Sequence, residues 1–281
     1  MAKSDSWLER MKQNGLAKRA TAAFVLLALF IAGLAAGFWG VAALAVSGAA
    51  MMSYEYSRMW DSGFGIRRIL NVLAASGPVV AYYFLRGAFP AYCFSAALVT
   101  FFCLFLLANV ITDREHWILE SIAPLYIGLP MLSLVYTHTV AGVYSLLFAF
   151  VITSATDTGA FIIGFAFRGP KLAPSISAGK TWSGAIGGLM CAFALGTTYT
   201  IVRIWNSGAH DFSGVYFWAC ASLVFSALSQ IGDLFESKLK RIAGVKDAGA
   251  LLPGHGGALD RFDSLLFVAP LLALLLAFTK L

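Results

Sequence analysis

The stretch AGVYSLLFAFVITSATDTGAFIIGF, residues 141–165, contains a single charged side chain, Asp157. A helix needs about 20 predominantly apolar residues to cross the hydrocarbon core of a bilayer. This stretch is long and apolar enough to do so, and it indicates that the solvent of the chain is lipid.

Similar stretches follow one another along the chain. Of its 281 residues, 59% are hydrophobic and 12% are charged, and the mean hydropathy is +0.79. A soluble domain carries about 25% charged residues. We therefore expect an all-α polytopic integral membrane protein with about nine transmembrane helices. The expected spans are 21–37, 39–54, 69–85, 91–110, 118–136, 141–165, 183–204, 213–232 and 264–279.

The distribution of Lys and Arg predicts how these spans are oriented. With the N-terminus in the cytoplasm, 17 of the 20 Lys and Arg residues fall on the cytoplasmic side, and only Arg86, Arg203 and Lys280 fall on the other. This split follows the positive-inside rule and predicts a C-terminus outside. It also explains the net charge of +6, so no nucleic acid is expected as a partner.

One loop holds an unusual share of the charge. Residues 233–263 contain ten of the 34 charged side chains, and carboxylates run into the spans at both ends. Asp233 lies at the end of one span, while Asp260 and Asp263 open the next. If the first helix continues, its face also carries Glu236, Ser237 and Lys240. Carboxylates at this density suit Mg²⁺, in one or two copies, with Asp233, Asp260 and Asp263 as expected ligands.

The sequence LLPGHGG, residues 251–257, lies between these carboxylates. Proline and three glycines predict a non-helical turn, and glycine lets backbone N–H groups approach an anion closely. A plain connection between helices is the commoner meaning of such a turn. The nearby cations Lys246 and Arg261 favour a site for nucleotide phosphates.

A second polar cluster covers residues 153–184. A carboxylate within the bilayer costs on the order of 3 kcal/mol, so Asp157 is a functional candidate, with a protonated or hydrogen-bonded structural role as the alternative. Cations and hydroxyls in the loop that follows suit a phosphate group, although the cations are also a topology signal. They are Arg168, Lys171, Ser175, Ser177, Lys180 and Thr181.

The order of these residues resembles the signature of phosphatidate cytidylyltransferases. The resemblance rests on SKLKR at 237–241, Lys246-Asp247, LPGHGG at 252–257, DRFD at 260–263 and the upstream stretch from Asp157 to Trp182. It extends more weakly to Arg19, to YIGLP at 126–130 and to Glu55, which we expect to be a structural partner of an arginine. The chain departs from the usual family pattern at Ala178, Gly179, Ser183 and Ala258.

The resemblance implies transfer of a cytidylyl group from CTP to phosphatidate, giving CDP-diacylglycerol and pyrophosphate, with Mg²⁺. It also implies a homodimer among membrane lipids, in a bacterial cytoplasmic (inner) membrane, with the active site facing the cytoplasm. Catalytic roles are expected for Asp233, Lys240, Asp260, Arg261 and Asp263. Substrate binding is expected for Asp157, Lys171, Ser177, Lys180, Arg241, Lys246, Asp247, Gly254, His255, Gly256 and Gly257.

These expectations divide the chain into three regions. Residues 1–20 form a cytoplasmic lead-in, either amphipathic or disordered. Residues 21–137 form the N-terminal transmembrane helices, and residues 138–281 form the catalytic region with its cytoplasmic loops.

Two other functions stay open. A CTP-dependent polyprenol or lipid kinase would release CDP instead of pyrophosphate. A cation-coupled membrane transporter would place polar residues near the middle of several spans, in paired repeats. The gathering of charges on one face favours catalysis at the membrane surface.

Overall fold

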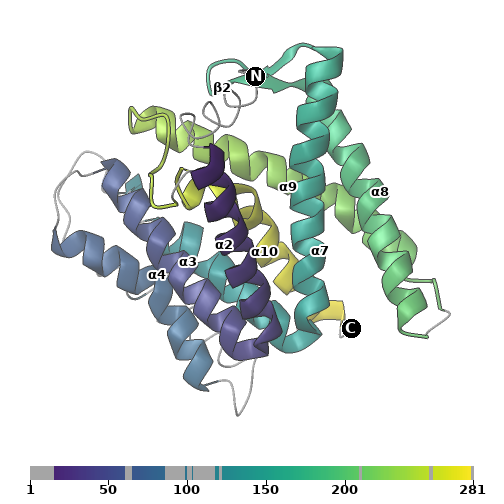
Figure 1. Ribbon diagram of the computed structural model, residues 1–281, viewed down its shortest axis with the longest axis horizontal. Helices are drawn as coiled ribbons and strands as arrows, with labels where there is room; N and C mark the ends of the chain where they lie inside the picture. Colours follow the sequence, from purple (N-terminus) through teal and green to yellow (C-terminus); the bar gives the residue numbers. More distant parts are fainter. Residues whose placement is uncertain are drawn as a thin grey trace, which may run out of the picture.

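The computed structural model describes residues 16–60, 65–85, 99, 103, 118–119, 122–208, 211–252 and 256–279. These residues form a bundle of helices (Figure 1). In chain order the helices are α2 (Leu16–Ala35), α3 (Gly37–Trp60), α4 (Ile66–Leu85), the π-helix η1 (Pro124–Gly128), α7 (Leu129–Phe167), α8 (Trp182–Asn206), α9 (Val215–Ile242) and α10 (Leu259–Thr279).

Five of the described helical stretches are long and apolar enough to cross a membrane. They are Gly37–Trp60, Pro124–Phe167, Trp182–Asn206, Val215–Ile242 and Leu259–Phe278. This agrees with the predicted all-α membrane architecture. The number of nine spans and the sides of the two termini stay predictions. The expected span 91–110 lies outside the described residues except for Val99 and Cys103.

A glycine divides the longest helical stretch. Two expected spans, 118–136 and 141–165, overlap the continuous stretch Pro124–Phe167. Gly142 interrupts it with φ 75° and ψ −175°. Glycine adopts positive φ without the steric cost that a side chain would bring, so the helix kinks at this position. The kink lies within a few residues of the expected boundary between the two spans.

Small residues let α7 and α8 pack closely. A Cβ atom added at Gly184 would lie 2.7 Å from the carbonyl oxygen of Ala160, and one at Gly188 would lie 2.8 Å from that of Thr156. In lipid, where helices associate mainly by van der Waals packing, such small residues let backbones approach. This contact places the end of α7, which carries Asp157, beside the start of α8.

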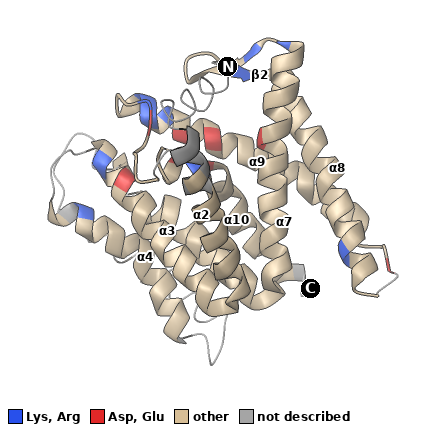
Figure 2. Ribbon diagram, viewed as in Figure 1, with Lys and Arg blue, Asp and Glu red and all other residues tan. Residues whose placement is uncertain are grey.

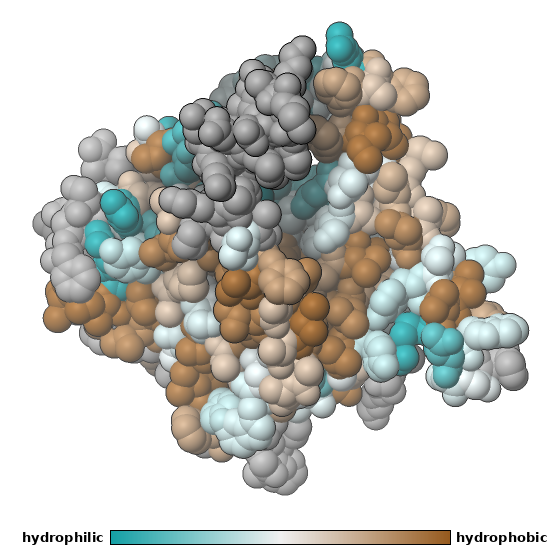
Figure 3. All heavy atoms as spheres, viewed as in Figure 1, coloured by the Kyte–Doolittle hydropathy of each residue, from teal (hydrophilic) through white to brown (hydrophobic). Residues whose placement is uncertain are grey.

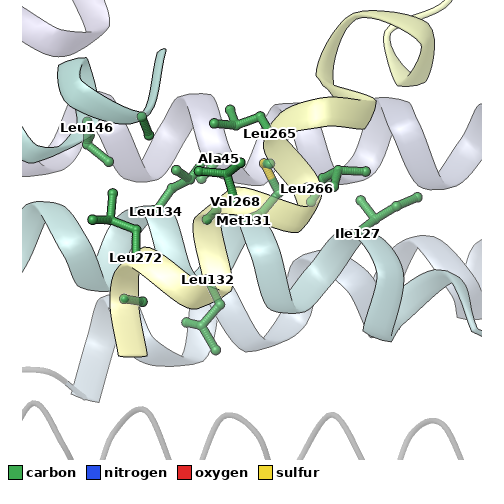
Figure 4. Packing of buried hydrophobic residues seen from close by; sticks show 14 of the residues in the cluster. Ala45, Ile127, Met131, Leu132, Leu134, Leu146, Leu265, Leu266, Val268 and Leu272 are labelled. Atoms are coloured by element: carbon green, nitrogen blue, oxygen red, sulfur yellow. The ribbon is translucent and has the colours of Figure 1, made fainter. Parts of the chain in front are cut away.

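The core lies where α10 packs against α7 and α3. Figure 4 shows its apolar side chains interlocking, among them Ala45 of α3, Leu132 of α7 and Leu266 and Leu272 of α10. Leu132 and Leu272 are completely buried, and Leu266 is 2% exposed. Packing of this kind fixes α10, and with it the acidic residues of its first turn, against the rest of the bundle.

A short β-hairpin, β1 (Lys171–Ala173) and β2 (Ser177–Thr181), connects α7 to α8. The strands pair antiparallel, with Lys171 opposite Thr181 and Ala173 opposite Ser177. The all-α expectation did not include this element. It forms because the connection reverses direction between two adjacent helix ends, so its backbone groups can pair with each other.

The outer surface of α7 and α8 is apolar. Phe161 and Phe165 of α7 and Met190 of α8 are 74%, 69% and 65% exposed. Figure 3 shows brown side chains over this side of the bundle and hydrophilic side chains in a hollow beside α7. Large apolar side chains exposed together in this way are typical of a surface that faces lipid.

Candidate active site

Most of the described charged residues gather at one end of the bundle. Figure 2 shows them around the β-hairpin, the far end of α9, the start of α10, the end of α3 and the start of α4. Helix α9 continues to Ile242, ten residues beyond the expected end of its span, and α10 begins at Leu259. The residues from 233 onward in α9 therefore lie beside the first turn of α10.

Three carboxylates from these two helices form an acidic cluster. One oxygen each from Asp233, Glu236 and Asp263 lies within 4.8 Å of the other two. Gly232 permits the approach, because a Cβ atom there would lie 2.7 Å from the carbonyl oxygen of Asp263. Glu236 is 1% exposed and Asp263 is 9% exposed.

The acidic cluster fits a hard cation. Within the described part of the chain, the Oε1 atom of Glu236 is buried without a hydrogen-bond partner. A buried carboxylate oxygen of this kind is costly unless a proton or a cation satisfies it. Carboxylate oxygens are ligands that Mg²⁺ takes in proteins, with water and substrate phosphates in its remaining positions. The sequence predicted Glu236 on the same helical face as Asp233, but the expected metal ligands did not include it.

Asp260 is held by a different set of partners. Its Oδ1 atom lies 2.7 Å from Nζ of Lys240, which lies 2.7 Å from Oε2 of Glu236. Asp260 also accepts hydrogen bonds of 3.2 Å from the backbone N–H groups of Ala248 and Gly257. Lys240 thus joins Asp260 to the acidic cluster, whereas Asp260 itself lies outside the group of three. Its role as a metal ligand stays a prediction.

Lys180 of the hairpin and Asp157 of α7 lie next to the acidic cluster. Nζ of Lys180, at the end of β2, lies 2.6 Å from Oδ2 of Asp233. The Ser264 hydroxyl, next to Asp263, lies 3.5 Å from an oxygen of Asp157 and donates to it. Residues from α7, the hairpin, α9 and α10 are therefore brought to one place.

A cavity of about 770 Å³ adjoins the acidic cluster between α7, α8 and the hairpin. Asp157 and Asp233 lie on its wall together with three cations. The cations are Arg168, Lys171 and Lys180. Phe161 and Phe165 line another part of it. The cavity can thus receive a ligand that is anionic at one end and apolar at the other.

Glu55 holds the loop between α9 and α10. It is 1% exposed and lies in α3, yet its carboxylate accepts hydrogen bonds from the backbone N–H groups of Leu251 (3.1 Å) and Leu259 (3.0 Å). Gly249 and Gly257 pack directly against this carboxylate, where a side chain would collide with it. The role expected for Glu55 was only that of a partner of an arginine. In the sequence, the signal for a role of Glu55 was the position of an acidic residue at the end of a span.

The glycine turn is partly described. The N–H of Leu252 donates to the carbonyl oxygen of Gly256 at 3.0 Å, and Gly256 has φ 84°, a conformation that favours glycine. Of the expected phosphate-binding residues, Gly254 and His255 lie outside the described residues.

The other expected site residues lie around this end of the bundle. Nε of Arg241 donates to the carbonyl oxygen of Ile176 at 3.4 Å and so links α9 to the hairpin. Ser177 is half-buried in β2. Lys246, Asp247 and Arg261 are exposed. Ser183, one of the departures from the family pattern, accepts a 3.1 Å hydrogen bond from the N–H of Gly169, which ties α8 to the end of α7.

Comparison with known proteins identifies the family. The profile of the cytidylyltransferase family matches residues 17–279. A phosphatidate cytidylyltransferase of Staphylococcus saprophyticus is 42% identical over 158 residues, which cover 56% of this chain and 57% of that protein. One from Haemophilus influenzae is 42% identical over 139 residues, covering 48% of this chain and 46% of that protein. The chain therefore spans about half the length of the curated relatives it matches. Because the profile covers nearly the whole sequence, the chain belongs to the cytidylyltransferase family.

Proposed function

We propose that the protein is a phosphatidate cytidylyltransferase, which converts CTP and phosphatidate to CDP-diacylglycerol and pyrophosphate. The observation that carries the proposal is the acidic cluster beside a cavity with cationic and apolar walls. A nucleotide bound with a divalent cation requires the acidic cluster. A phosphate on a diacylglycerol requires a cavity with cationic and apolar walls. The similarity to phosphatidate cytidylyltransferases of two bacteria supports the same choice.

The reaction is a single displacement at phosphorus. An oxygen of the phosphatidate phosphate attacks the α-phosphorus of CTP and forms a new P–O bond. The bond from the α-phosphorus to the oxygen that bridges to the β-phosphate breaks, and pyrophosphate leaves with its electron pair. The nucleophile is already an anion, so no covalent enzyme intermediate is needed. The main barrier is bringing two anions together, and positioning and charge neutralisation lower it.

The residues of the site divide this work. Asp233, Glu236 and Asp263 would hold Mg²⁺, with Asp260 as a further ligand if the cluster takes a second cation. A cation held there would supply positive charge against the triphosphate. Arg168, Lys171 and Lys180 would hold the lipid phosphate in the cavity, with Phe161 and Phe165 beside the acyl chains. Lys240, Arg241, Lys246 and Arg261 would hold the nucleotide phosphates, together with the glycine turn at 254–257.

The proposal includes the membrane arrangement. The end of the bundle with the acidic cluster faces the cytoplasm, where CTP is available, in the inner membrane of a bacterium. The 17 to 3 division of Lys and Arg and the bacterial relatives support this orientation. The division into an N-terminal helical part (21–137) and a catalytic part (138–281), and the homodimer, rest on the sequence and the resemblance.

Two differently labelled forms of CTP test the function. With purified protein, phosphatidate and Mg²⁺, label in the α-phosphate should enter the lipid, while label in the γ-phosphate should leave as pyrophosphate. A lipid kinase would instead transfer the γ-label and release CDP. A transporter would consume no CTP. Transfer of the γ-label, or no transfer of either label by folded protein, would contradict the proposal.

A further inference from the structure

A second cavity, of about 430 Å³, lies at the other end of the same helices. Its wall includes Tyr144 of α7, Arg203 of α8 and Trp218 of α9. Helix α8 begins at Trp182, two residues after Lys180. Arg203 lies about 32 Å further along the helix at 1.5 Å per residue. The hydrocarbon core is about 30 Å thick. The second cavity therefore lies at the opposite membrane surface from the acidic cluster.

Aromatic side chains mark this level of the bundle as an interface with water. Trp205, near the end of α8, is 66% exposed, and Tyr216, at the start of α9, is 82% exposed. Trp and Tyr are enriched where lipid headgroups meet the hydrocarbon core. A ligand in the second cavity would thus have its polar part at headgroup level.

The cavity holds a positive group, the guanidinium of Arg203. The guanidinium carbon of Arg203 lies 3.5 Å from the centroid of the Tyr144 ring. The hydroxyl of Tyr199 donates to the backbone oxygen of Tyr144 at 2.7 Å and steadies that turn. Stacking uses the face of the guanidinium and leaves its N–H edges available. Within the described part of the chain, no carboxylate pairs with Arg203.

The same cavity holds a negative group. Asp211, in the connection between α8 and α9, accepts a 2.9 Å hydrogen bond from the N–H of Ser213. This bond holds the pKa of the Asp211 carboxyl below its ordinary value. Figure 2 shows these charges, one basic and one acidic segment, isolated at this end of α8 and the following loop.

The depth of the cavity is apolar. Phe148 and Trp218 form an edge-to-face pair with ring centroids 5.2 Å apart. Leu272 and Leu276 of α10 complete this wall. A hydrocarbon chain can lie here, below the two charged side chains.

We propose that this cavity binds a phospholipid whose headgroup carries a primary ammonium, such as phosphatidylethanolamine. Its phosphate would accept hydrogen bonds from Arg203, its ammonium would donate to Asp211, and an acyl chain would lie against Phe148 and Leu276. An anionic headgroup would satisfy Arg203 but meet repulsion from Asp211. A choline headgroup has no N–H to donate. The site goes beyond the proposed reaction, because it lies at the other membrane surface.

Lipid competition on the purified full chain tests the site. Delipidated protein in detergent receives equal amounts of phosphatidylethanolamine, phosphatidylglycerol and phosphatidylcholine with the same acyl chains, and native mass spectrometry measures the lipid retained. We expect phosphatidylethanolamine to be retained about 10-fold over the other two. Arg203→Gln should lower retention of both phosphatidylethanolamine and phosphatidylglycerol by about 10-fold. Asp211→Asn should remove only the preference for phosphatidylethanolamine.

Control variants keep the test decisive. Asn206→Ala, an exposed change at the same end of α8, should leave the preference intact. Asp211 is in an exposed loop, so its variant should fold even if Arg203→Gln does not. Equal retention of the three lipids by the wild type, or an unchanged preference in Asp211→Asn, would overturn the proposal. Tighter retention of phosphatidylglycerol by the wild type would show an anionic-lipid site and refute the role of Asp211.

Discussion

Replacing Glu55 with glutamine tests whether a buried acid of α3 positions the loop between α9 and α10. The two oxygens of Glu55 accept the N–H groups of Leu251 and Leu259, at 3.1 and 3.0 Å. Glutamine has nearly the same shape but only one acceptor oxygen, and its NH₂ group would face a second donor. One of the two backbone N–H groups therefore loses its partner in a buried place.

The size of the effect follows from the strength of that bond. A hydrogen bond to a charged acceptor contributes about 1.5–3 kcal/mol, and each 1.4 kcal/mol corresponds to a factor of about ten. The same loop supplies the Ala248 and Gly257 N–H groups that hold Asp260. If the lost hydrogen bond to Glu55 lets the loop shift away from Asp260, kcat for cytidylyl transfer should drop by about 10- to 100-fold.

Steady-state kinetics in mixed micelles of detergent and phosphatidate measure this drop, with the thermal unfolding midpoint recorded alongside. Arg58→Gln is the matched control, because Arg58 is exposed on the same helix, and it should keep wild-type kcat. A Glu55→Gln protein that folds and turns over within twofold of the wild type would refute the positioning role. A lower unfolding midpoint with unchanged kcat would show that Glu55 only stabilises the fold.

Three further predictions concern the site and its orientation. Asp233→Asn and Asp260→Asn should each lower kcat by at least about 100-fold in protein that still inserts and folds, as loss of a major transition-state interaction does; near-normal turnover in either variant would remove that residue from the site. EDTA should abolish activity and added Mg²⁺ should restore it, because carboxylates otherwise repel a triphosphate; full turnover after metal removal would contradict the acidic cluster as a cation site. In a background without native cysteines, an impermeant thiol reagent added to intact cells should label cysteine at Ser207 and spare one at Ala250, both exposed positions; labelling of Ala250 from outside would reverse the proposed topology.

The sequence alone determined the class of the protein and the region of its site. Hydropathy is a property of consecutive residues, so runs such as 141–165 indicate a lipid-embedded helix before any packing is known. Helical periodicity is equally local, and it put Asp233, Glu236 and Lys240 on one face of α9. The spacing of charged residues across 233–263 carried the resemblance to the family that the profile then identified.

Only the tertiary structure decided which groups meet. Glu55 is 196 and 204 positions from the residues it holds, and Lys180 reaches Asp233 from a hairpin that hydropathy does not reveal. Likewise, Glu236 completes the acidic cluster while Asp260 pairs with Lys240. These contacts depend on how closely α9, α10 and α3 pack against one another. That approach is set by interhelical packing, as at Gly232, and periodicity within a single helix carries no information about it.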